Sequence, residues 1–541
     1  MIYNKFLKSK DMNHIRKYKL FNFIALIAAA AYLSGCTKLD ITPKSTLTPD
    51  IFPTTPAQYL AATGPIYTSF RTAPGREYWL LQNLSTDENV LVARGGNWLD
   101  GGTYSTVNLH TVTPDNGMIE SCWSWGYKTI STCNQVLTLF SSVAESTSKQ
   151  QTVAEIKTMR ALSYFYMMDL FGNVPISKTF GDTTNLGTQT RAQVFAFVES
   201  ELLAQIPNLS ATVDASTYGR PTKFLAYAIL AKMYLNAEYY TGTQRYQDAV
   251  VMCDNIINGG KYSLDADYLG MFKPNNGPLI KDFIFAIPYD GIQATGMYYS
   301  RWTINPNLKN KYKMPYTPDG PVYTYKQFYA LYNDPNDIRR KQYLTGKQYN
   351  NDGTPINITT TNIGLDASYS GSAPNATVIH QLEFTPDIVW KNNATFDIGN
   401  DELANEEGYR NNKFYPDSLN TDRNQGNDVP MFRYADVLLE KAEAIMRGAS
   451  ATNGATALTL VNQVRTRAKA SLLLSITLQD ILDERGRELA IEMWRRNDMI
   501  RFGQFEKAWG IKTDANPNKR IFPIPRPEMQ LNPKLVQNPG Y

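Results

Sequence analysis

Trp98 lies at the centre of a segment whose residue types could bind a ligand. It stands between two glycine pairs in a loop-type sequence, and its polar neighbours are Arg94, Asn97 and Asp100. An indole ring can cover the C–H face of a sugar while polar groups reach the surrounding hydroxyls. The pattern therefore predicts a ligand-binding loop. The alternative is that Trp98 closes the loop onto the core, because large aromatic side chains usually bury most of their area.

A second aromatic cluster lies two hundred residues further along the chain. Tyr298, Tyr299 and Trp302 surround Arg301 in a segment rich in tyrosine and glycine. The same chemistry predicts a second wall of a binding site, with Arg301 as its polar group. A spacing of three or four residues also fits one buried face of a helix, so a stripe of core residues is the alternative.

Asp436, Glu440 and Glu443 are the acidic residues that most resemble a catalytic pair. A glycoside hydrolase needs two carboxyl groups roughly 5–10 Å apart, on either side of a substrate cleft. These three instead share one face of a helix rich in alanine, with Lys441 and Arg447 nearby. The pattern predicts a solvated, charge-balanced face, and we expect no enzyme.

The charged run that follows has the same interpretation. Asp483 with Arg487, and Glu492 with Arg496, have the four-residue spacing of ion pairs on a helix surface. These pairs are therefore expected to lie in solvent.

No metal or cofactor is expected. Beyond the first 35 residues the only histidines are His110 and His380, and neither has neighbours at metal-ligand spacing. Calcium could be held by Asp87, Glu88 or Asp100, but no ligand pattern supports it. Residues 1–35 carry a net charge of +5, which leaves about −1 for the remainder of a chain whose total is +4. That balance gives no reason to expect nucleic acid as a partner.

The N-terminus has the pattern of a targeting segment. A basic run precedes the apolar residues 20–32, which are too few to span a bilayer, and Leu33-Ser34-Gly35-Cys36 follows. This motif resembles a bacterial lipobox, so residues 1–35 are predicted to be a signal peptide and Cys36 to carry lipid. An ordinary secretory signal is the alternative. Residues 36–52, rich in proline and threonine, would form the tether, and residues 53–541 a single domain.

The other three cysteines are interpreted as small buried apolar residues. Cys122 and Cys133 fall on one predicted helix about 16 Å apart, which is too far for a disulfide. Cys253 lies in another helical pattern.

The elements that would position these residues are mainly helical. Apolar spacing predicts helices over residues 56–67, 119–140, 153–170, 192–205, 219–240, 246–257, 431–446, 455–470 and 478–505. They form a scaffold over approximately 53–260 and 431–510. Glycine, proline and tyrosine dominate two loop-rich excursions, approximately 78–117 and 261–430, with short extended runs such as 282–288. Ala231 and Tyr234 facing Tyr246 and Ala249 would make a hairpin like a tetratricopeptide unit.

Several motifs in the same order resemble the SusD/RagB family of outer-membrane lipoproteins. The most specific are RYADVLLEKAEA from Arg433, VNQVRTRAKA from Val461, ERGRELAIEMWRRNDMIRFG from Glu484, and LNPKLVQNPGY at the end; MRALSYFYMMDLFGNVPI from Met159 matches earlier. The resemblance implies tetratricopeptide-like hairpins that carry loop-built excursions.

The resemblance also implies a function. It would make the chain a non-catalytic lipoprotein on the cell surface that captures oligosaccharide and passes it to a SusC-like TonB-dependent transporter. Binding of peptide or another nutrient, as in RagB-like members, is the alternative, and a glycoside hydrolase is the other class. The family motifs lie on the scaffold, so the loop residues named above are predicted from their chemistry alone.

Overall fold

The computed structural model describes residues 52–361, 377–399, 401–420 and 422–541. The predicted signal peptide, most of the tether and Cys36 lie outside the described residues. From Pro53 to Tyr541 the chain forms one compact unit.

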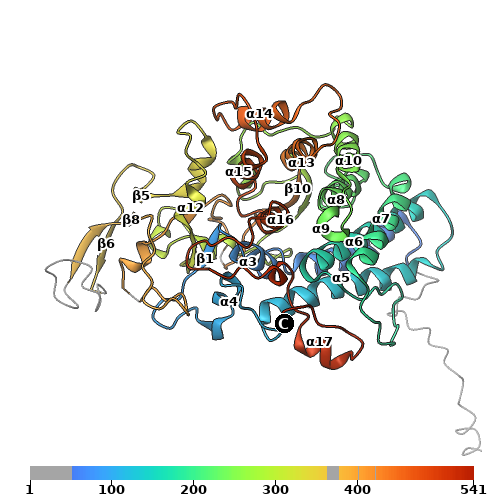
Figure 1. The fold of residues 1–541 in the computed structure, drawn as a ribbon, viewed down its shortest axis with the longest axis horizontal. Helices are drawn as coiled ribbons and strands as arrows, with labels where there is room; N and C mark the ends of the chain where they lie inside the picture. The colour runs from blue at the N-terminus through green and yellow to red at the C-terminus, as the bar shows by residue number, and fades with distance from the viewer. Residues whose placement is uncertain (1–51, 362–376, 400, 421) are drawn as a thin grey trace, which may run out of the picture. The chain divides into compact units, whose positions relative to one another are not determined.

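Helices that follow one another in the chain pack as antiparallel hairpins, and the fold is mainly α as predicted. The pairs are α5 with α6, α6 with α7, α8 with α10, and α13 with α14, while α10 against α13 joins the two halves of the scaffold (Figure 1). The bounds are α2 Pro56–Arg71, α5 Gly117–Phe140, α6 Thr147–Phe171, α7 Arg191–Gln205, α8 Lys223–Leu235, α9 Ala237–Thr241, α10 Tyr246–Asn258, α13 Tyr434–Met446, α14 Ala457–Arg467 and α15 Leu478–Glu488.

Small residues let these helices approach closely. At Gly126 of α5, an added Cβ would lie 2.1 Å from the sulfur of Met167 in α6, so a larger residue there would displace the Met167 side chain. Gly172, with φ 69°, ends α6 in the left-handed region that glycine enters freely. The predicted pairing of Ala231 with Ala249 also falls within a real hairpin, α8 with α10.

Two predicted helices differ from the observed ones: one begins three residues later than predicted, after a strand, and the other is broken in the middle. Residues 429–433 form strand β10 (Val429–Arg433), which pairs antiparallel with β2 (Phe283–Ile287), the extended run predicted at 282–288. The predicted helix 478–505 breaks after Glu488 and resumes as α16 (Arg495–Arg501). Ile491 and Met493 between them have φ of 54° and 69°, which a continuous helix excludes.

The first predicted excursion begins with a helix that the loop-type composition concealed. α3 (Glu77–Leu84) is buried from Tyr78 onward and leads into β1 (Asn89–Leu91). β1 pairs antiparallel with β3 (Val322–Thr324) of the second excursion, so a two-stranded sheet joins the two loop-rich regions. A short helix, α4 (Ser105–Asn108), follows.

The second excursion holds only short elements. The strand pairs are β4 (Tyr343–Leu344) with β9 (Arg410–Asn411), β5 (Gly346–Lys347) with β8 (Glu383–Phe384), and β6 (Asn357–Thr360) with β7 (Val378–Gln381). The helices are α11 (Tyr299–Thr303) and α12 (Lys326–Tyr329); α17 (Arg526–Leu531) lies in the C-terminal segment.

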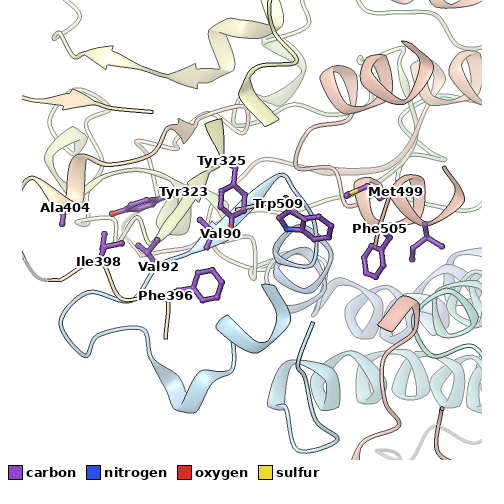
Figure 2. Packing of buried hydrophobic residues seen from close by; sticks show 11 residues of the cluster. Val90, Val92, Tyr323, Tyr325, Phe396, Ile398, Ala404, Met499, Phe505 and Trp509 are labelled. Carbon is purple, nitrogen blue, oxygen red and sulfur yellow. The ribbon is translucent and has the colours of Figure 1, made fainter. Parts of the chain in front are cut away.

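One apolar cluster packs both excursions against the C-terminal helices. Figure 2 shows Val90 and Val92 after α3, Tyr323 and Tyr325 around β3, and Met499, Phe505 and Trp509 from the C-terminal region. Phe396, Ile398 and Ala404 complete its loop side. Because these side chains come from four segments that are distant in the sequence, their burial fixes β1 and β3 against the scaffold.

The acidic face of α13 is buried, so the expectation of a solvated face is wrong. Asp436, Glu440 and Glu443 are 3%, 1% and 0% exposed. The ammonium of Lys232 in α8 lies 2.6 Å from Asp436 and 2.5 Å from Glu440, and Arg501 in α16 binds Glu443 at 2.7 Å. These carboxylates face neighbouring helices rather than solvent. A four-residue spacing shows that residues share one helix face, but it does not show whether that face meets water or another helix.

The predicted surface ion pairs, Asp483 with Arg487 and Glu492 with Arg496, do not form. Arg487 binds Glu484 at 2.8 Å, and Glu492 binds Lys413 at 2.5 Å and Arg433 at 2.6 Å. The charged run therefore forms a buried ion-pair network. Burial raises the pKa of Glu484, but Arg339, Arg487 and Arg465 outweigh burial and hold that pKa at about 2.

Candidate functional site

The loop that carries Trp98 leaves the body at Ala93, whose backbone is hydrogen-bonded on both sides. The backbone N–H of Ala93 donates to the carbonyl of Phe396 at 2.9 Å, and Ile398 N–H donates back to Ala93 at 3.0 Å. Arg94 and Asn97 then exchange backbone hydrogen bonds of 2.9 and 3.1 Å, which closes a tight turn. The loop is thus held at its base and turns sharply just before Trp98.

Trp98 itself has a strained backbone. Its φ is 68°, a region that costs a bulky residue about 1–3 kcal/mol. Gly96, with φ 98°, and Gly101, with φ 64°, lie on either side of it, and an added Cβ at either glycine would meet no atom within 4 Å. This part of the loop therefore stands clear of the body, and the ring of Trp98 is half-buried.

The structure brings Trp98 and Trp302 together. Their ring centroids lie 4.9 Å apart at 61°, an edge-to-face contact of two aromatic rings. Trp302 is only 1% exposed, and the ring of Tyr104 packs on it at 6.0 Å. The two walls expected from the sequence are therefore one platform, in which buried Trp302 supports Trp98.

The three aromatic residues of the second cluster have different positions. Tyr299 is 1% exposed, stacks on Trp79 at 4.2 Å and donates from its hydroxyl to the Pro74 carbonyl at 2.7 Å. It therefore anchors α11 to α3. Tyr298 is half-buried at the start of α11, and its backbone N–H donates to the Gly75 carbonyl at 3.2 Å.

The polar residues predicted around Trp98 also separate into two kinds. Arg94 donates to the Asn405 side chain at 2.9 Å and to the Asp319 carbonyl at 2.6 Å, so its guanidinium braces the loop. Asn97 and Asp100 are exposed on the loop. They are therefore the polar side chains of this set that a ligand on Trp98 can reach.

Two arginines lie next to the platform: Arg301 was predicted as the polar group of the second aromatic cluster, and Arg76 was not predicted. The guanidinium carbons of Arg76 and Arg301 lie 5.4 and 5.6 Å from the centre of the Trp302 ring. Arg301 pairs with Asp319 at 2.5 Å. Burial, together with the charge of Asp100, raises the pKa of Tyr104. No local pattern in the sequence indicated Arg76, because its partner Trp302 is more than two hundred residues away.

The other residues considered for chemistry are engaged elsewhere. His110 stacks on Phe505 at 4.4 Å, and burial lowers its pKa to about 3. His380 hydrogen-bonds to Glu406. Asp87 accepts two hydrogen bonds from Arg495 at 2.8 and 2.7 Å.

Within the described ranges, no group of three or more histidine, cysteine, aspartate or glutamate side chains is arranged to hold a metal ion. In the same part of the chain, no helix is both long and apolar enough to cross a membrane. Cys122, Cys133 and Cys253 are buried free thiols, as expected.

Comparison with known protein families shows the class to which this helical scaffold of stacked hairpins belongs. Residues 228–541 match the sequence model of the SusD family, and residues 63–235 match one described as starch-binding associating with outer membrane. Because the first match covers more than half of the chain, the chain belongs to the SusD family, as the sequence motifs indicated.

Two relatives of known name are SusD or SusD-like proteins. The chain is 26% identical to SusD-like protein P2 of Formosa agariphila, over 97% of this chain and 100% of that protein. It is 25% identical to the starch-binding protein SusD of Bacteroides thetaiotaomicron, over 72% of each chain.

Solved structures share the fold. A SusD superfamily protein from Parabacteroides distasonis, 22% identical, superposes with a TM-score of 0.69 over 92% of this chain and 100% of that one. Surface glycan-binding protein A from Bacteroides thetaiotaomicron, determined in complex with laminarihexaose, is 21% identical with a TM-score of 0.66 over 89% and 99%.

Proposed function

We propose that this chain is a non-catalytic lipoprotein of the outer membrane that binds oligosaccharide through the Trp98 platform and passes it to a SusC-like TonB-dependent transporter. The observation that carries the proposal is the strained, half-exposed Trp98 held on buried Trp302. Backbone strain of this kind is retained where the surroundings enforce it and clusters at ligand sites. Family membership and the names of the relatives support the ligand class.

The platform supplies the two parts that sugar recognition needs. The Trp98 ring offers an apolar plate to the C–H face of a sugar, and exposed Asn97 and Asp100 can exchange hydrogen bonds with its hydroxyls. Trp302 prevents Trp98 from collapsing inward, so the plate is in place before the ligand arrives. A shallow site of this type gives modest affinity, which suits a protein that releases its cargo.

Calorimetric titration with laminarihexaose and with maltohexaose tests the proposal. Trp98→Ala should weaken the binding of whichever glycan the wild type accepts by at least tenfold. Phe180→Ala is the matched control, because Phe180 is an exposed aromatic residue (45%) on a loop of the helical scaffold. A Trp98→Ala protein with unchanged affinity and an unchanged unfolding midpoint would remove the platform from the site.

Peptide binding and hydrolysis are the competing functions. Aromatic platforms also hold peptides, so a peptide library in the same calorimeter separates these two ligand classes. For hydrolysis, the acids singled out from the sequence are unsuitable. Asp436, Glu440 and Glu443 are enclosed among helices and bound to lysine and arginine, so no glycosidic bond reaches them. Shortened products after incubation of purified protein with oligosaccharide would reverse this conclusion.

Anchoring and partner are tested in the native cell. Cys36→Ala should move the protein from the membrane fraction to the soluble fraction, because lipid on that thiol would supply the anchor. Purification of the wild-type protein from mild detergent should bring with it one TonB-dependent β-barrel, identified by mass spectrometry. A chain that stays in the membrane fraction after the Cys36 substitution would refute lipidation there.

A further inference from the structure

A cavity of about 330 Å³ lies beside α2, and none of the platform residues Trp98, Tyr104 and Trp302 lines it. One wall is α2 itself, from Leu60 to Arg71. The opposite walls are residues 218–220, before α8, and residues 285–288, at the end of β2. The volume is at the lower end of the range of roughly 300–1,000 Å³ found for small-molecule sites.

Two glycines create the space. Gly64 faces the cavity from the middle of α2, and an added Cβ there would meet no atom within 4 Å. Gly219 lies on the other side with φ 69°, where a Cβ would lie 2.8 Å from the ring of Pro288. The backbone of residue 219 therefore packs directly on Pro288, and α2 leaves an open slot opposite it.

The walls are apolar because their polar atoms have partners inside the protein. Phe70, Phe285 and Ile287 are buried side chains that line the cavity. The Tyr218 hydroxyl donates to Asp428 at 2.7 Å, and Arg220 donates to Glu155 at 2.7 Å. These groups present ring faces and side-chain stems to the cavity, which is the environment of an apolar ligand.

Arg71 is the exception among the lining residues. It is half-buried at the C-terminal end of α2, and among the residues that the structure describes its guanidinium has no hydrogen-bond or ion-pair partner. The charge of Arg71 helps to lower the pKa of Asp290, but the two side chains form no ion pair. One oxygen of the Asp290 carboxylate instead accepts the backbone N–H groups of Ile292, Gln293 and Ala294. A planar cation at the edge of an apolar cavity favours an anionic group on the ligand.

We propose that this cavity binds a small amphiphilic anion, with its apolar body against Phe70, Phe285 and Ile287 and its carboxylate on Arg71. The charge complementarity of Arg71 and the apolar walls together define this class, and neither an uncharged sugar nor an inorganic anion satisfies both. The site is separate from glycan capture, so its test does not depend on the Trp98 platform.

The fluorescence of 8-anilinonaphthalene-1-sulfonate, an apolar body with one sulfonate, provides the first probe. The full mature protein should bind one molecule with enhanced emission. Gly64→Leu fills the slot and should weaken binding at least tenfold. Leucine favours helix more than glycine does, whereas Pro65 disfavours a side chain on the residue before it, so these opposing effects should leave the unfolding midpoint nearly unchanged.

The charge is tested separately. Arg71→Met keeps an apolar stem against the cavity wall and removes only the guanidinium. In the wild type, decanoate should displace the probe at least fivefold more effectively than decanol, and Arg71→Met should abolish that difference. Cinnamate in place of decanoate distinguishes an aromatic acid from an aliphatic one as the natural ligand.

Equal probe binding by the wild type and Gly64→Leu would overturn the proposal, because the probe would then lie elsewhere. Displacement by decanol as readily as by decanoate would overturn the role of Arg71. Near-ultraviolet circular dichroism of each variant confirms that the probe reports on folded protein rather than on exposed core.

Discussion

Replacement of Arg433 by methionine is expected to lower the midpoint of thermal unfolding by about 3–5 °C. The guanidinium of Arg433 lies 2.9 Å from Asp282, 2.8 Å from Glu488 and 2.6 Å from Glu492, and all four side chains are buried. Methionine has a similar length and cannot donate to any of the three carboxylates. Their remaining partners, such as Lys413 on Glu492, cannot replace all of the lost contacts.

The magnitude follows from burial. Removal of one partner from a buried ion pair costs about 3–5 kcal/mol, because the charges left behind stay out of water. Unfolding entropy of about 2.1 cal/mol/K per residue, over the roughly 490 residues from Pro53 to Tyr541, corresponds to about 1 kcal/mol per degree. The expected shift is therefore several degrees, even for a chain of this size.

Differential scanning calorimetry at one scan rate measures this shift, and Arg526→Met is its matched control. Arg526 donates two hydrogen bonds to Asp115, at 2.6 and 2.8 Å, but its side chain is 56% exposed. Solvent screens such a pair, so this variant should unfold within about 1 °C of the wild type. Equal shifts for the two variants would refute the reasoning that burial decides the contribution.

Three further predictions concern other parts of the chain. Burial raises the pKa of Glu88 to about 8, so between the ordinary carboxyl pKa and pH 8 the folded state keeps a proton that the unfolded chain releases, and stability falls as pH rises through that window. Glu88→Gln should therefore raise the unfolding midpoint by a few degrees at pH 8 and change it little at pH 4.5; equal shifts at both pH values would contradict this. A methyl group at Gly75 would lie 2.0 Å from the carbonyl oxygen of Gly296, so Gly75→Ala should destabilise the protein by about 1–3 kcal/mol in calorimetry. An unchanged unfolding midpoint would show that the backbone shifts to accommodate the methyl group. The three buried thiols are those of Cys122, Cys133 and Cys253. Ellman's reagent should react with none of them in the folded protein and with all of them in denaturant. Rapid reaction in the folded protein would show that these thiols are accessible.

The helical hairpins could be predicted because their signals are local. Apolar spacing, capping residues and a stop such as Gly172 act within a few turns of chain, and α5, α6, α7 and α10 begin and end within a few residues of the expected positions, apart from an early start of α6 at Thr147. The short helix α3 was missed because the polar and glycine-rich residues after it dominate the composition of that region. Its burial depends on contacts such as Trp79 with Tyr299, which are distant in the sequence.

The buried charges could not be predicted for a related reason. The helical spacing of Asp436 and Glu440 correctly puts both on one face of α13, but their partner is Lys232, two hundred residues earlier. A local pattern shows which side chains share a face and does not show what covers it. Charged residues on a helix are usually solvated, so the exception is visible only in three dimensions.

The candidate site shows the same limit and also why the site is rigid. Trp98 was identified from its own loop, and Trp302 from another, but no local signal places one ring on the other. Once Ala93 is clamped on both sides and Arg94 braces the turn, the strained backbone at Trp98 has no easy way to relax. A platform held in this way is already ordered before a ligand arrives, so binding avoids most of the entropy cost of arranging a mobile loop. Modest affinity would then reflect the small contact area of one half-buried ring rather than the flexibility of the loop that carries it.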